Sequence, residues 1–69
     1  MYRLEKVSDG DYCIFLSEGI FPRVTETDSE TLSSEILRVE GNSRKKITAS
    51  DLSSSVKSFI VSRTGKEFN

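Results

Sequence analysis

The clearest hydrophobic pattern in the chain lies between residues 49 and 63. Its apolar positions recur with helical spacing, at Ala49, Leu52, Val56, Phe59 and Ile60. At about 100° per residue these side chains gather on one side of a helix, as a core-facing stripe does. Thr48 is a candidate N-cap that Asp51 can answer in a capping box, and Gly65 suits the C-terminal end. The pattern predicts one helix over residues 49–63, with a frayed tail unless Phe68 folds back on it.

The first third of the chain has the pattern of β-strands. Residues 2–7 alternate loosely, residues 12–17 are apolar on both faces, and residues 20–26 form a further strand-length segment. Glycine-containing turn signals at 9–10 and 18–19 separate the three segments. These features predict a three-stranded antiparallel meander. Its middle strand should be covered on both sides, because both of its faces are apolar.

The middle of the chain has a second helical pattern. Thr27-Asp28-Ser29-Glu30 reads as an acidic helix start, and Gly41 ends the segment. The apolar face between them consists of Leu32, Ile36 and Val39. The pattern predicts a helix over residues 28–40, followed by a short extra strand over residues 44–47. The expected fold is therefore a single α+β domain over residues 1–69, in which three strands precede two helices.

Composition narrows the classes of protein. The 69 residues are 35% hydrophobic and 30% charged, with no histidine and one cysteine. An intramolecular disulfide is excluded, and a zinc site is not expected. No apolar run is long enough to span a membrane, and the N-terminus lacks the pattern of a signal peptide. These features, with the single thiol, favour a soluble protein in the reducing cytoplasm.

Candidate catalytic groups are few. Asp9 and Asp11 flank a turn glycine, where aspartate is common for local structural reasons. Cys13 has no histidine to activate it, and no glycine-rich phosphate-binding motif is present. We therefore expect neither an enzyme nor a cofactor or metal. The least favoured interpretation is an enzyme or metal protein built on the Asp9–Asp11 turn and Glu18.

Charge is distributed unevenly between the two parts of the chain. Residues 1–40 carry a net charge of −5 and residues 41–69 a net charge of +4. The two ends could simply attract each other, or the basic part could bind nucleic acid or an acidic protein surface. The residues for that second role are Arg44, Lys45, Lys46, Lys57 and Arg63. Two successive helices would also resemble a helix-turn-helix, although the second has no Asn or Gln to read bases.

The outer side of the 49–63 helix indicates a different kind of partner. It carries small side chains with one cation and one valine, namely Ser50, Ser54, Lys57, Ser58 and Val61. Such a strip is either merely solvated or approached closely by another protein, including a second copy of the chain. We favour a small protein-binding regulator or inhibitor that occupies a partner's surface and forms a homodimer. Accessory proteins of bacterial viruses have this profile. Nucleic-acid binding is the alternative.

Overall fold

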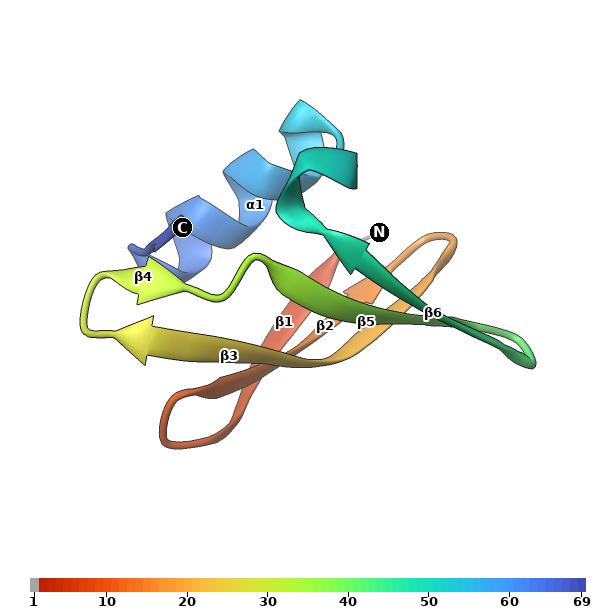
Figure 1. Ribbon diagram of the computed structural model, residues 1–69, viewed down its shortest axis with the longest axis horizontal. Helices are drawn as coiled ribbons and strands as arrows, with labels where there is room; N and C mark the ends of the chain where they lie inside the picture. The colour runs from red at the N-terminus through yellow and green to blue at the C-terminus, as the bar shows by residue number, and fades with distance from the viewer. Residues whose placement is uncertain (1) are drawn as a thin grey trace.

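The computed structural model describes residues 2–69, and this part of the chain is mainly β-sheet (Figure 1). It contains one α-helix, one turn of 3₁₀ helix and seven strands. The strands are β1 (Arg3–Ser8), β2 (Asp11–Leu16), β3 (Gly19–Asp28), β4 (Thr31–Leu32), β5 (Glu35–Glu40), β6 (Ser43–Thr48) and β7 (Glu67–Phe68). The 3₁₀ turn η1 covers Ala49–Asp51, and the α-helix α1 covers Ser54–Thr64.

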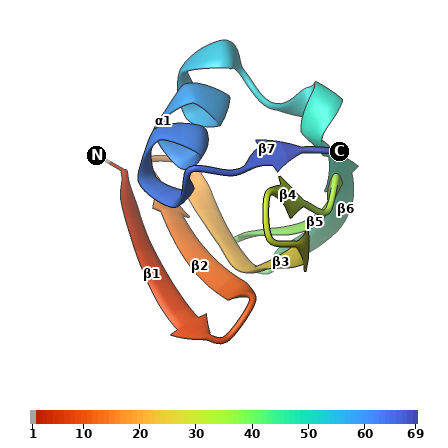
Figure 2. The same ribbon diagram turned by 90° about the vertical axis from the view of Figure 1, so that its left-hand side faces the viewer.

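The long strand β3 connects all parts of the sheet. Its first half lies between β2 and β5, since Ile20 pairs with Phe15 on one side and with Val39 on the other. Its second half pairs with β4, which in turn pairs in parallel with the C-terminal β7. Five strands therefore follow one another in the order β1-β2-β3-β5-β6. Figure 2 shows this sheet curving beneath α1.

The core lies between the helix and one face of the sheet. It consists of Tyr12, Ile14, Phe21, Val24, Leu32, Ile36, Val56 and Ile60. Along β2 the burial alternates, with Tyr12 and Ile14 buried and Cys13 half-buried on the opposite face. Because α1 and η1 both lie on the core side (Figures 1 and 2), the expectation that the middle strand is covered on both faces is not met.

The predicted fold class is wrong, because residues 28–40 do not form a helix. They contain the end of β3, the short β4 and the whole of β5. The Asp28 carboxylate accepts a hydrogen bond from the Glu30 backbone N–H at 2.8 Å, which makes this acidic stretch a turn between strands rather than a helix cap. The two helices expected after the meander are thus replaced by a mixed sheet and one α-helix.

The remaining predicted elements fit the structure more closely. The three expected strands correspond to β1, β2 and β3, and the short strand expected over 44–47 lies within β6. The helix expected over 49–63 is interrupted: η1 ends at Asp51, and Ser53 caps a new helix by accepting the Val56 N–H at 3.3 Å. Gly65, in the left-handed conformation, ends α1 as expected.

Candidate functional site

An open groove of about 660 Å³ lies between α1 and β7. One wall is formed by Ser50 of η1 and by the α1 residues Ser54, Lys57, Ser58 and Val61. The other wall is formed by Glu67, Phe68 and Asn69. The structure therefore brings together all five residues that the sequence assigned to partner binding, along the side of the helix that faces away from the core.

The helical period separates this groove wall from the core. Val56 and Ile60 are buried at 4% and 0% exposure, whereas Ser54 and Ser58 are exposed. Neither of these two serine hydroxyls has a hydrogen-bond partner among the described residues. Val61, one residue after the buried Ile60, is half-buried at the groove. The wall is thus an accessible strip of short hydroxyls with an apolar patch at Val61.

Backbone hydrogen bonds hold the opposite wall in place. After Gly65 reverses the chain, the Glu67 N–H donates to the Glu30 carbonyl at 3.1 Å and the Asn69 N–H donates to the Leu32 carbonyl at 3.0 Å. The Asn69 side-chain oxygen accepts a further hydrogen bond from the Ser34 N–H at 3.0 Å. The tail that was expected to fray is therefore a strand. Its ordering adds a wall that the helical pattern alone did not indicate.

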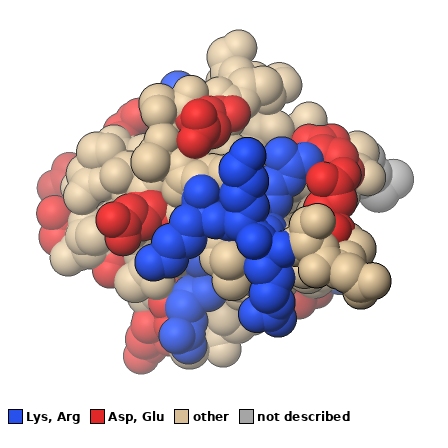
Figure 3. Space-filling model, turned by 45° about the vertical axis from the view of Figure 1, so that its right-hand side comes forward, with Lys and Arg blue, Asp and Glu red and all other residues tan. Residues whose placement is uncertain are grey.

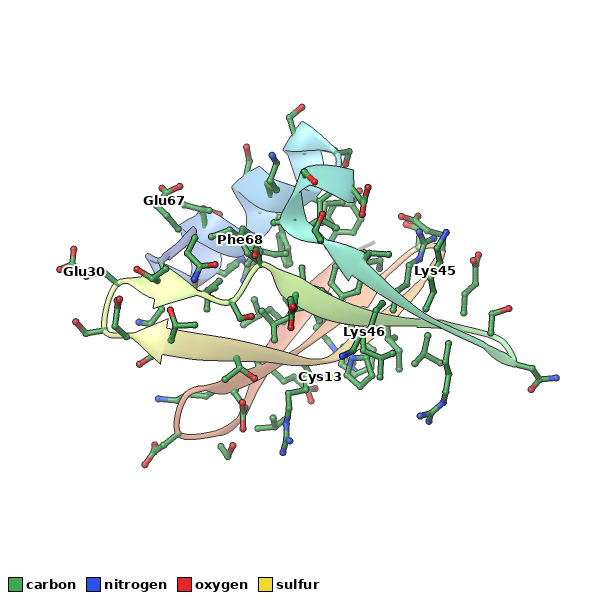
Figure 4. The ribbon with its side chains drawn as sticks, in the orientation of Figure 1. Cys13, Glu30, Lys45, Lys46, Glu67 and Phe68 are labelled. Atoms are coloured by element: carbon green, nitrogen blue, oxygen red, sulfur yellow. The ribbon has the colours of Figure 1, made fainter. Side chains whose placement is uncertain are left out.

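The groove offers three kinds of contact to a ligand. Phe68 packs partly against the core, while Glu67 points outward (Figure 4). Val61 and Phe68 supply apolar surface, the free serines supply hydroxyls, and Lys57 and Glu67 supply opposite charges. The strand-like alternation of Lys66, Glu67 and Phe68 directly after the helix-ending glycine was the sequence signal for this second wall.

The five basic residues predicted for nucleic acid do not form one surface. Arg44 and Lys46 share one face of β6, whereas Lys45 points to the other face, where it is cross-strand from Arg38 (Figure 4). Lys57 lines the groove, and the Arg63 guanidinium lies 5.2 Å from the centre of the Phe59 ring. The resemblance to a helix-turn-helix is also lost, because the first of the two helices does not exist.

A band of basic side chains nevertheless crosses one side of the molecule. Figure 3, which turns the β5–β6 end of the sheet toward the viewer, shows Lys and Arg side chains gathered there. Arg38 and Lys45 contribute to a second, smaller pocket of about 360 Å³ that also contains Glu18 and Asp51. Because that pocket carries two cations and two carboxylates, it shows no preference for one sign of charge.

The groups weighed as catalytic are held in structural roles. The Asp11 carboxylate accepts hydrogen bonds from Ser8 at 2.9 Å and from Thr25 at 3.1 Å, which together with the nearby Arg23 lower its pKa. Desolvation raises the pKa of the Cys13 thiol, and so disfavours the nucleophilic thiolate. Residues 2–69 contain no group of three or more metal-ligating side chains that could hold a metal ion.

Two further observations concern the chain as a whole. None of the helical segments in residues 2–69 has the length and apolarity needed to cross a lipid bilayer. Comparisons of the chain with protein-family models, with curated proteins and with solved structures found no match.

Proposed function

We propose that this protein binds another protein through the α1–β7 groove and acts by occupying part of its partner's surface. The observation that carries this proposal is the convergence of Ser50, Ser54, Lys57, Ser58 and Val61 with the ordered C-terminal strand on one groove. The unpaired cysteine fits a reducing compartment, so we place the interaction in the cytoplasm.

The composition of the groove suits a polypeptide ligand. Serine side chains lose little conformational entropy when they are immobilised, and their small size lets a partner backbone approach closely. Val61 and Phe68 offer the apolar contacts that supply most of the free energy of binding. The unpartnered hydroxyls of Ser54 and Ser58 can pair with backbone groups of the partner, so that few polar groups would be left unsatisfied at the interface.

A second copy of the chain is one partner that the groove can accept. Lys57 on one wall and Glu67 on the other give it both signs of charge. Two copies related by a two-fold axis can therefore place the Lys57 of each subunit near the Glu67 of the other. A homodimer formed in this way would regulate the protein's own activity, since it would hide the surface that a different partner uses.

Sedimentation equilibrium of the purified protein tests the homodimer directly. Self-association through the groove predicts a mass approaching twice 7.8 kDa as concentration rises. Val61→Asp and Ser54→Glu should each restore the monomer. Ser55→Glu is the matched control, because Ser55 is in the same first helical turn but does not line the groove. Equal dissociation of the Ser54→Glu and Ser55→Glu variants would contradict an interface at the groove.

Site-specific crosslinking tests binding to a different protein. A photoreactive amino acid at Ser58 should capture a partner in cells of the organism that encodes the chain, whereas the same group at Thr27 on β3 should not. Adding Val61→Asp should abolish the product from position 58. The proposed function fails if position 27 captures the same partner equally well, or if Val61→Asp leaves capture unchanged.

A further inference from the structure

The face of the sheet opposite α1 is apolar and has no cover in residues 2–69. Phe15, Ile20, Leu37 and Val39 are half-buried, yet none of them belongs to the core or packs against it. A solvated sheet face normally carries polar side chains. This face is separate from the α1–β7 groove, since none of its residues lines that groove.

The strand register aligns this apolar surface into one row with a cation at each end. Arg3 pairs with Phe15, Phe15 with Ile20, Ile20 with Val39, and Val39 with Arg44. The row crosses five strands, so its two arginines lie about 19 Å apart at the usual strand spacing. In the neighbouring row Lys46 pairs with Leu37, which adds a second cation beside Arg44.

The charges on this face are unevenly neutralised. At one end, Arg3 makes an exposed ion pair with Glu5 at 3.4 Å, and its guanidinium carbon lies 4.2 Å from the centre of the Phe15 ring. At the other end, neither Arg44 nor Lys46 has a carboxylate within 4.0 Å among the described residues. The face therefore combines a stacked guanidinium and aromatic ring with two unpaired cations.

We propose that this sheet face binds single-stranded nucleic acid. Arg44 and Lys46 contact phosphates, and Arg3 adds a third positive charge. Bases stack on the Phe15–Arg3 pair and lie against Ile20 and Val39, because exposed bases pack on aromatic rings and on guanidinium planes alike. The row contains no Asn or Gln, so binding is sequence-tolerant.

Protection of the sheet edge and binding of an acidic polypeptide each fit only some of these features. Lysine on an edge strand such as β6 discourages unwanted strand pairing, but that role does not require an apolar row across five strands. An acidic polypeptide would satisfy Arg44 and Lys46 but would place charged groups over Phe15 and Ile20. Nucleic acid matches both the cations and the flat apolar surface, which favours it over an acidic protein.

Fluorescence anisotropy with a labelled ten-residue oligothymidylate tests the proposal. Three phosphate contacts predict that log K falls with log salt concentration with a slope of about −2, and that an Arg44→Ala/Lys46→Ala double variant reduces this slope to about −0.7. Phe15→Leu keeps the face apolar but removes the ring, so it should weaken binding at least about fivefold. Thermal unfolding of each variant confirms that the fold is retained.

Matched variants distinguish this face from other surfaces. Lys57→Ala/Arg63→Ala also removes two positive charges, but from α1, and should leave both affinity and salt slope unchanged. The groove variant Val61→Asp should likewise have no effect, so the outcome is independent of the proposed protein binding. Absence of binding at low salt, or equal loss in the two double variants, would overturn the proposal. Competition by oligoglutamate as effective as by unlabelled oligothymidylate would overturn it in favour of an acidic polypeptide.

Discussion

Replacing Ile60 with alanine tests which side of α1 faces the core. Ile60 has 0% exposure in the centre of the hydrophobic cluster. The substitution removes three carbon atoms, whose transfer from water is worth about 0.8 kcal/mol each, and it also leaves a cavity. The expected loss is about 3–4 kcal/mol, a large part of the roughly 3–10 kcal/mol that a 69-residue domain has.

The neighbouring Val61 is the control, because it lies on the groove side. Val61→Ala should change the free energy of unfolding by no more than about 0.5 kcal/mol, since its side chain is half-buried and alanine favours helix. Urea unfolding followed by circular dichroism measures both variants. If Ile60→Ala leaves too little folded protein, Ile60→Val should cost about 0.5–1.5 kcal/mol. Equal effects at positions 60 and 61 would refute the orientation of the helix, and with it the accessible groove wall.

Three further predictions concern the sheet. A β-carbon on Gly19 would lie 2.8 Å from the Val39 carbonyl oxygen, so Gly19→Ala should cost about 1–3 kcal/mol in thermal or urea unfolding; unchanged stability would show that β3 and β5 are not this close. The lowered pKa of Asp11 means that its ionised form stabilises the fold above the unfolded-state pKa of about 3.9, and this contribution is lost as pH falls through the lower folded-state pKa. Urea midpoints of the wild type and Asp11→Asn should therefore differ more at about pH 7 than at about pH 2, and a constant difference would argue against the Ser8 and Thr25 hydrogen bonds. The raised pKa of Cys13 predicts slower reaction with Ellman's reagent at about pH 8 in the folded protein than in denaturant, and equal rates would contradict it.

The candidate sites differ in how far the sequence anticipated them. The serine-lined side of α1 could be recognised, because helical periodicity assigns every residue of a helix to one side once the apolar stripe is known. The second wall of the groove could not, since β7 is only two residues long and is held by hydrogen bonds to β4, more than thirty positions earlier in the chain. The row from Arg3 to Arg44 depends on the register of five strands, which no local pattern specifies.

The sequence by itself determined the features that depend on neighbouring residues. These are the turns between the first three strands, the core-facing stripe of α1 and the glycine that ends this helix. The tertiary structure decided the conformation of residues 28–40. Leu32 and Ile36 are four positions apart, which suits one helical face, yet each is buried from a separate strand. Pairing of β5 with β3 and β6 satisfies its backbone through distant partners, and this long-range hydrogen bonding overrides a helical pattern that was only three apolar residues long.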